Sequence, residues 1–83
     1  MDKNSIMSRL GTLLHELFDV DPAAVSPETR LSELGVDSML SADMMLDIED
    51  ALGFTFRNMD LPRDPTLQDV VDLVHANLVQ AGN

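Results

Sequence analysis

The stretch LGVDSMLSADMMLDIEDALG, residues 34–53, combines a helical apolar pattern with a serine that directly follows an aspartate. At about 100° per residue, apolar side chains four positions apart share one helix face. The face that we expect to meet the core consists of Leu40, Met44, Ile48 and Leu52. We predict a helix that begins at Asp37 or Ser38 and continues to about Leu52. Gly53 then stops this helix.

The same segment has two further faces that a small core does not need. Nearly opposite the core face lie the apolar residues Met39, Ala42 and Leu46, and Met45 lies between the two faces. A third stripe is acidic, at i, i+4 and i+7, and consists of Asp43, Asp47 and Asp50. Either the preceding loop covers the second apolar face, or this face contacts a partner. Methionine is flexible and polarizable, so it suits a surface that meets several proteins.

Helical spacing also predicts a first helix from Ser5 to Phe18, with Asn4 or Ser5 as its cap. Its apolar stripe consists of Ile6, Leu10, Leu13, Leu14 and Leu17. A long loop follows over residues 19–37, where prolines and a glycine interrupt any longer periodic element. We expect four apolar residues to pin this loop to the core, namely Val20, Val25, Leu31 and Leu34.

The last helix is expected to open at Pro65 and Thr66, where Thr66 and Asp69 form a T-x-x-D capping arrangement. Its buried stripe consists of Leu67, Val70, Val71, Val74 and Leu78. A short helical turn is expected before it, around Met59 to Leu61, and strand-like alternation appears only briefly, at residues 53–56. We therefore predict an all-α fold, a small four-helix bundle in a single domain over residues 1–83. It has three main helices, one short third helix and a long loop after the first helix.

The composition is strongly acidic and excludes several classes of function. Among 83 residues, 15 acids and 5 bases give a formal net charge of −10, and there is no cysteine. Such a surface disfavours nucleic acids and anionic membranes, and a cysteine-free chain has no disulfide or thiolate metal site. No stretch approaches the about 20 apolar residues of a membrane span, which predicts a soluble, cytoplasmic protein. Because no Lys or Arg lies between Arg30 and Arg57, the acids of this interval indicate a docking surface for basic partners.

Ser38 is the residue whose chemistry needs an explanation. Taken alone, a serine at this place is a helix cap, whereas a catalytic serine needs a base and an oxyanion hole. The G-x-S-x-G elbow is absent, and the two histidines, His15 and His75, belong to the first and last helices. We therefore reject a hydrolase and predict no catalytic residue. A serine at a helix N-terminus is a suitable place to attach a phosphate, because the helix dipole and free N–H groups favour an anion.

A calcium-binding loop is the metal site that an acidic helical chain invites. The best candidate loop spans residues 19–30. It has Ala24 in place of the required glycine and Arg30 in place of the bidentate glutamate. We therefore predict no metal site.

The stretch ELGVDSML, residues 33–40, followed by an acidic and apolar helix, resembles the acyl carrier proteins. In that family a D-S-[LM] motif carries 4′-phosphopantetheine on its serine, and the resemblance covers essentially the whole chain. It implies that Ser38 holds this covalent cofactor as a phosphodiester. Asp37 would be the motif acid that the transferase and its magnesium-bound coenzyme A recognise. The resemblance also implies that partner enzymes bind a surface made of Met39, Ala42, Asp43, Leu46, Asp47, Glu49 and Asp50.

The resemblance further implies a monomeric, non-catalytic carrier that transports acyl groups as thioesters. Its partners would be a phosphopantetheinyl transferase, a ketosynthase, an acyltransferase or acyl-activating ligase, and other pathway enzymes with basic docking patches. Docking would be fast, weak and steered by charge.

Departures from the family pattern bear on the pathway. The sequence G-V-D-S differs from the G-G-x-S of peptidyl carriers, and Leu40 stands where fatty-acid carriers often have an acid. Arg57 and Arg63 lie where the housekeeping proteins are usually acidic. These departures favour a discrete carrier of a polyketide or other specialised pathway, such as antibiotic biosynthesis, over primary fatty acid biosynthesis, and Met1 favours a free-standing protein. Two alternatives stay open: a peptidyl or aryl carrier of a nonribosomal pathway, and an acidic helical interaction module without a cofactor.

Overall fold

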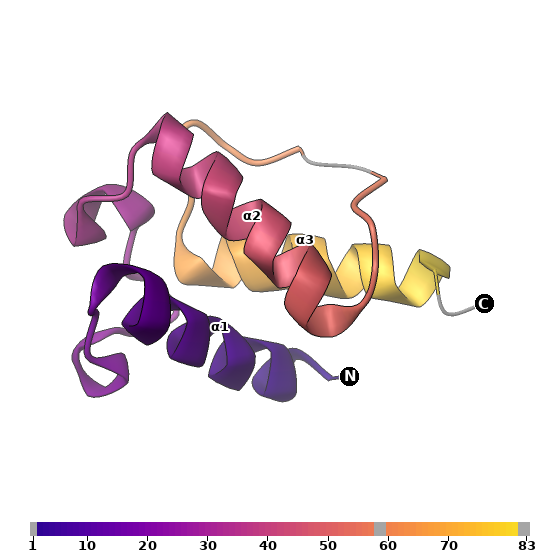
Figure 1. Ribbon diagram of the computed structural model, residues 1–83, viewed down its shortest axis with the longest axis horizontal. Helices are drawn as coiled ribbons and strands as arrows, with labels where there is room; N and C mark the ends of the chain where they lie inside the picture. Colours follow the sequence, from indigo (N-terminus) through magenta and orange to yellow (C-terminus); the bar gives the residue numbers. More distant parts are fainter. Residues whose placement is uncertain (1, 58–59, 82–83) are drawn as a thin grey trace.

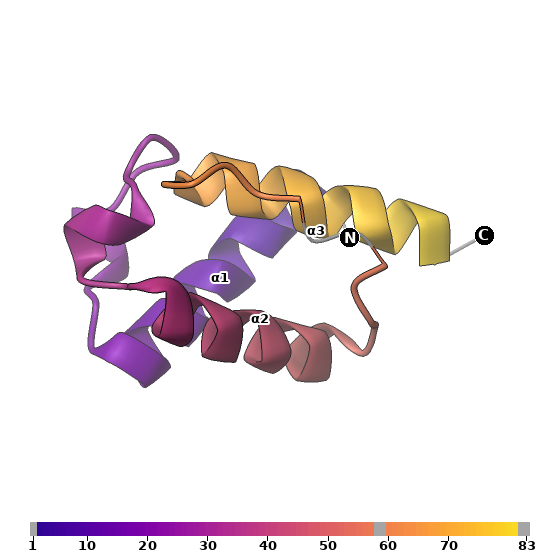
Figure 2. The same ribbon diagram turned by 90° about the horizontal axis from the view of Figure 1, so that it is seen from above.

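The computed structural model describes residues 2–57 and 60–81. Within these ranges the chain forms the α-helices α1 (Lys3–Phe18), α2 (Ser38–Leu52) and α3 (Leu67–Ala81), and the short 3-10 helices η1 (Pro22–Ala24) and η2 (Leu31–Leu34). The described ranges contain no strand, so the all-α prediction is confirmed. In Figure 1 α1 lies below α2 and α3, and in Figure 2, turned by 90°, it runs obliquely behind α2 toward α3. No helix in this part of the chain has both the length and the apolar character that a membrane crossing requires.

α1 begins two residues earlier than expected, because Asp2 caps it. Asp2 Oδ1 accepts a hydrogen bond from Ser5 N at 2.8 Å, so the prediction of a cap at Asn4 or Ser5 is wrong. An aspartate at this position satisfies one of the first free amides of the helix. The end at Phe18 is as predicted, and Asp19 follows it in the left-handed conformation with φ of 58°.

The core lies where the apolar stripes of the three helices meet. The buried residues of α1 and α2 are Ile6, Leu10, Leu14, Met44, Met45 and Ile48. Those of α3 are Leu67, Val70, Val71, Leu73, Val74 and Asn77. Four residues expected in these stripes are only half-buried against this core, namely Leu13, Leu40, Leu52 and Leu78. Leu17 was also expected in the core, but it is 40% exposed at the last turn of α1.

The long loop is pinned to the core and to the start of α3. As predicted, Leu31 is buried, and three half-buried residues pack against the core, namely Val20, Val25 and Leu34. Two backbone hydrogen bonds join the loop to the start of α3. Leu31 N donates to Pro65 O at 3.0 Å, and Leu67 N donates to Thr29 O at 2.9 Å. The loop is therefore a packed element of the fold, and it contains η1 and η2, which periodicity did not predict.

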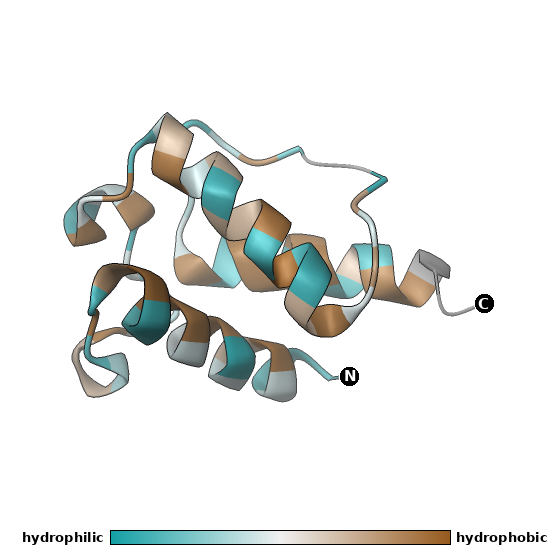
Figure 3. Ribbon diagram, viewed as in Figure 1, coloured by the Kyte–Doolittle hydropathy of each residue, from teal (hydrophilic) through white to brown (hydrophobic). Residues whose placement is uncertain are grey.

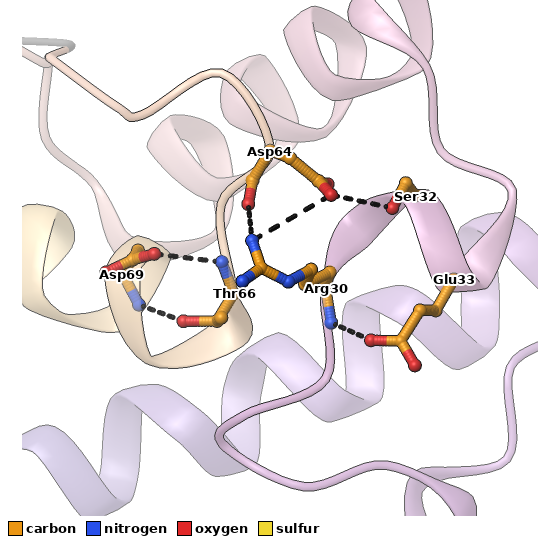
Figure 4. Close-up of polar contacts among 6 residues, drawn as sticks. All are labelled: Arg30, Ser32, Glu33, Asp64, Thr66 and Asp69. Atoms are coloured by element: carbon orange, nitrogen blue, oxygen red, sulfur yellow. Dashed lines mark hydrogen bonds and ion pairs between the residues drawn. The ribbon is translucent and has the colours of Figure 1, made fainter.

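Side chains reinforce this junction (Figure 4). Arg30 Nη1 donates to Asp64 O at 3.0 Å and lies 3.9 Å from Asp64 Oδ2, which also accepts from Ser32 Oγ at 3.0 Å. The predicted capping arrangement of α3 is confirmed: Thr66 N donates to Asp69 Oδ2 at 3.0 Å, and Asp69 N donates to Thr66 Oγ1 at 3.1 Å. The backbone just before α3 is therefore held on both sides.

An ion pair joins the start of α1 to α3. Lys3 Nζ lies 3.0 Å from Asp72 Oδ1, and Gln68 Nε2 donates to the same oxygen at 2.8 Å. The hydrogen bond from Gln68, followed by that from Lys3, stabilises the carboxylate and lowers the pKa of Asp72 below its ordinary value of 3.8. This contact lies away from Ser38, so it concerns the stability of the fold.

After α2 the chain runs back past the N-terminal end of that helix before it enters α3 (Figure 1). Gly53 ends α2 as predicted, in the left-handed conformation with φ of 70°. The expected short third helix includes Met59, which lies outside the described residues. Its described part, Asp60 and Leu61, is not helical. We call residues 60–66 the return segment.

Candidate functional site

Ser38 is the first residue of α2 and is exposed at the surface. The cap of α2 is the preceding residue, Asp37, whose Oδ1 accepts a hydrogen bond from Leu40 N at 2.9 Å. Ser38 is therefore not the cap of its helix, and no hydrogen bond within the described part of the chain engages its hydroxyl. The hydroxyl is therefore accessible from outside the protein, whereas the hydroxyl of a buried serine would be inaccessible.

The residues between η2 and α2 explain why Ser38 lies at the surface. Gly35 follows η2 in the left-handed conformation with φ of 77°, which other residues rarely adopt. Val36 then buries its side chain in the core, and its N–H donates to Leu31 O at 3.1 Å. Because Val36 anchors the chain from inside, the next two residues, Asp37 and Ser38, remain outside.

The start of α2 presents two backbone amides that are available to an anion. Asp37 accepts hydrogen bonds from the third and fourth amides of the helix. Leu40 N donates to its Oδ1, and Ser41 N donates to its carbonyl oxygen at 2.8 Å. Within the described ranges no hydrogen bond reaches the N–H of Ser38 or Met39. The first amides of a helix carry the positive end of its dipole, so a phosphate at Ser38 lies in a favourable field.

An open groove of about 350 Å³ adjoins Ser38, between the start of α2 and the return segment. Ser38 and Ser41 contribute to one wall, and Leu61 and Arg63 of the return segment contribute to the other. Leu31 of η2 also lines it. Arg63 is the one cation among the described residues of these walls. We call this feature the Ser38 groove.

The second apolar face of α2 is exposed to solvent. Met39 is 76% exposed, Leu46 is 63% exposed, and Ala42 between them is exposed as well. The long loop therefore does not cover this face. Along the outer side of α2, hydrophilic and hydrophobic bands alternate (Figure 3). Met45, which the helical pattern left between the two faces, belongs to the core.

The acidic residues of α2 differ in what they contact. Asp43 and Asp50 are exposed and Asp47 is half-buried, and none of the three has a hydrogen-bond or ion-pair partner within the described ranges. Glu49 is half-buried, and its Oε2 accepts a hydrogen bond from Phe56 N at 2.6 Å. Glu49 therefore holds the chain that leaves α2, a role that its place in a charged run did not reveal.

α1 contributes to this surface, which the sequence pattern did not indicate. A second open groove, of about 360 Å³, lies between the last turn of α1 and the middle of α2. It is lined by Leu17, Phe18, Leu40, Asp43, Leu46 and Asp47. Leu17 fits the apolar spacing of a core stripe, so only the packing of α1 against α2 shows that it lies at the surface. We call this feature the α1–α2 groove.

Among the described residues, no histidine that could act as a catalytic base lines the Ser38 groove. His15 is exposed on α1 and His75 is half-buried on α3, and neither lines the Ser38 groove. In residues 2–57 and 60–81 no group of three or more His, Cys, Asp or Glu side chains is placed to hold a metal ion. The geometry fits a serine that receives a group from another enzyme.

Comparisons with known proteins show what this chain is similar to. The sequence family described as "Phosphopantetheine attachment site" matches residues 8–74. Over 79 residues the chain is 30% identical to an acyl carrier protein of Coprothermobacter proteolyticus, covering 94% of this chain and 96% of that protein. It is 29% identical over 77 residues to an acyl carrier protein of Thermotoga maritima, covering 92% and 95%. It is also 32% identical over 66 residues to the non-reducing polyketide synthase tazA of Aspergillus terreus, covering 80% of this chain and 3% of that synthase.

Proposed function

This chain belongs to the family of acyl carrier proteins with a phosphopantetheine attachment site, and on that premise we propose that Ser38 is its attachment residue. As a member of this family it is a carrier with a covalent 4′-phosphopantetheine, and it is not an enzyme. The proposal for Ser38 rests on one observation, its exposed hydroxyl at the N-terminus of α2. The cofactor supplies the thiol that this cysteine-free chain lacks, and acyl groups bind to that thiol as thioesters.

The residues around Ser38 fit a phosphodiester. The two amides at the start of α2 have no acceptor in the described ranges and can donate to an anion at Ser38, and Arg63 adds a positive charge on the opposite wall of the Ser38 groove. Asp37 has two roles in this proposal. Its side chain caps α2, and, because the residue is exposed, its carboxylate is accessible to a phosphopantetheinyl transferase with its magnesium-bound coenzyme A.

Partner enzymes bind the outer side of α2 in this proposal. We define the docking face as Met39, Ala42, Asp43, Leu46, Asp47, Glu49 and Asp50. The exposed methionine and leucine offer an apolar contact, and the three acids without partners in the described ranges offer negative charge around it. The α1–α2 groove extends this face with Leu17 and Phe18. A basic patch that carries one apolar side chain fits this arrangement.

A carrier must bind each enzyme briefly and then leave it. Charge complementarity accelerates encounter without requiring a large buried area, so an acidic face with few apolar contacts suits this task. The proposed partners are the transferase, a ketosynthase, an acyltransferase or acyl-activating ligase, and further synthase enzymes. A monomeric state and a cytoplasmic location remain predictions.

The proposed pathway is polyketide or other specialised biosynthesis, with a discrete carrier in a single domain. Support comes from the relatives, which include both acyl carrier proteins of about this length and polyketide synthases. Support also comes from Arg57 and Arg63, which are exposed in a segment where the housekeeping carriers are usually acidic. The comparisons do not favour the alternatives of a peptidyl or aryl carrier or of a cofactor-free interaction module.

Loading the apo protein tests the attachment residue. The protein is incubated with coenzyme A, Mg²⁺ and a promiscuous phosphopantetheinyl transferase, and its intact mass is measured. We expect the wild-type protein to gain one phosphopantetheine group and the Ser38→Ala variant to gain none.

Ser41 offers a matched control for this experiment. It lies one helical turn after Ser38 and lines the same groove. The Ser41→Ala variant should load like the wild type. A Ser38→Ala variant that still gains the group, or a Ser41→Ala variant that loses it while it remains folded, would contradict the assignment.

A further inference from the structure

Arg63 stands out among the basic residues of this acidic chain. Three of the five bases have contacts that hold the fold. Lys3 pairs with Asp72, Arg9 Nη2 donates to Ala51 O at 3.3 Å, and Arg30 binds Asp64. The side chains of Arg57 and Arg63 make no hydrogen bond or ion pair within the described ranges. Of these two, only Arg63 lines the Ser38 groove.

Two acids, Asp37 and Asp64, line the Ser38 groove together with Arg63, and both accept hydrogen bonds from other residues. Asp64, the next residue in the chain, accepts from Arg30 and from Ser32, as Figure 4 shows. Asp37, on the other wall of the groove, caps α2 through Leu40 N. Arg63 therefore lines the groove without an ion-pair partner among the described acids. Such an arrangement fits an anion that arrives from outside the chain.

The backbone beside Arg63 is held in place by the fold. Arg63 lies between Pro62 and Pro65, which restrict the backbone. Pro65 is buried, and its carbonyl oxygen accepts the hydrogen bond from Leu31 N at 3.0 Å. Arg30 holds the carbonyl oxygen of Asp64 at 3.0 Å. The backbone of Arg63 is therefore fixed beside the groove, so binding of an anion costs mainly the rotamer entropy of this one side chain.

We propose that Arg63 is a positioning residue that binds the phosphodiester on Ser38, so that the arm lies along the Ser38 groove. This inference rests on the proposed attachment at Ser38. The phosphodiester keeps one negative charge at all physiological pH values, and it has oxygens for both the guanidinium and the free amides of α2. It is bonded to Ser38 itself and therefore lies at the groove, whereas a charged cargo would lie at the far end of the arm.

The contact is exposed, so its expected strength is modest. An exposed pair of this kind changes an equilibrium constant by about two- to five-fold. Attachment of the arm should therefore stabilise the wild-type protein more than Arg63→Gln. The unfolding equilibrium constant should fall on loading by a factor that is about two- to five-fold larger in the wild type. Salt should weaken the effect, because the screening length is only about 10 Å at 0.1 M ionic strength.

The test compares four loaded proteins: wild type, Arg63→Gln, Arg63→Lys and Arg57→Gln. Arg57 is the matched control, because it is an exposed arginine of the same connection that does not line the groove. The first readout is the ³¹P resonance of the phosphodiester. We expect Arg63→Gln to shift this resonance and to weaken its dependence on salt. Arg57→Gln should behave like the wild type, and Arg63→Lys should keep the salt dependence because it keeps the charge.

The second readout is the urea-unfolding equilibrium of the apo and loaded forms of each protein. The stabilisation that accompanies loading should fall in Arg63→Gln and persist in Arg57→Gln. Intact mass is measured first, so that the two proposals fail separately. If Ser38 is not loaded, the proposed function is overturned. If loading is normal but Arg63→Gln and Arg57→Gln give the same result in both readouts, only the role of Arg63 is overturned.

Discussion

Replacement of Asp37 by alanine should destabilise the apo protein by about 1 kcal/mol, because it removes the side chain that caps α2. The hydrogen bond that is lost joins Asp37 Oδ1 to Leu40 N at 2.9 Å. Loss of such a cap costs about 0.5–2 kcal/mol in general, and the exposed position of Asp37 places the cost near the middle of that range. In a domain of this size, about 1 kcal/mol lowers Tm by about 4–8 °C.

The Asp37→Asn variant separates the two roles of this residue. Asparagine caps helices about as well as aspartate, so this variant should lose only the interaction of the charge with the helix dipole, about 0.3–1 kcal/mol. It should nevertheless load more slowly than the wild type if the transferase recognises the carboxylate. Thermal unfolding followed by circular dichroism measures the first effect, and the initial rate of mass gain measures the second.

Asp50→Ala is the control for this pair of variants. Asp50 is an exposed acid on the same helix, and it has no partner within the described ranges. Its removal should change the free energy of unfolding by less than about 0.5 kcal/mol. An Asp37→Ala protein as stable as Asp50→Ala would refute the assignment of Asp37 as the cap. An Asp37→Asn protein as unstable as Asp37→Ala would show that charge, and not the hydrogen bond, stabilises the start of α2.

Three further expectations address the docking face, the core and the response to acid. Asp43→Lys should slow acyl transfer from partner enzymes without altering the midpoint of urea unfolding. The control Glu28→Lys, in the long loop, should leave transfer unchanged. Equal slowing by both variants would show that only the net charge matters. Leu14→Ala should cost about 2–5 kcal/mol in urea unfolding because this side chain is fully buried, and Leu17→Ala should cost much less while it slows transfer. Because folding lowers the pKa of Asp72, its contribution to stability is present above 3.8 and is lost as the pH falls through the lowered pKa. The free energy of unfolding, measured as a function of pH, should therefore fall less on acidification in Asp72→Asn than in the wild type. Parallel curves of this free energy against pH for the two proteins would exclude this contribution.

The helices themselves follow from local sequence. The bounds of α2 and the capping pair of α3 agree with prediction, because caps and helical periodicity depend on residues no more than four positions apart. The start of α1 was missed for a related reason. Asp2, Asn4 and Ser5 are all residues that cap helices, and the sequence pattern alone did not decide among them.

The surface residues were harder to assign. Leu17 continues the apolar spacing of α1 but is 40% exposed, because it lines the open groove between the last turn of α1 and α2. Met45 lies on the boundary of two helix faces, and packing places it in the core. Glu49 belongs to a run of acids, but its carboxylate accepts a hydrogen bond from Phe56 N in the segment that follows α2. These assignments depend on the positions of neighbouring elements, and the periodicity of a single helix carries no information about those positions.

The amino-acid sequence alone determined the helical class, the limits of α2, the acidic character of its outer side and the Asp-Ser pair at its start. These properties depend on the composition and on interactions within single turns of helix. Tertiary structure decided that the hydroxyl of Ser38 is accessible, that α1 adds to the docking face and that Arg63 stands across a groove from that serine. Arg63 and Ser38 are brought together by contacts between residues 27–31 and 64–68, and a pairing of segments so distant in the chain leaves no periodic signal in either one.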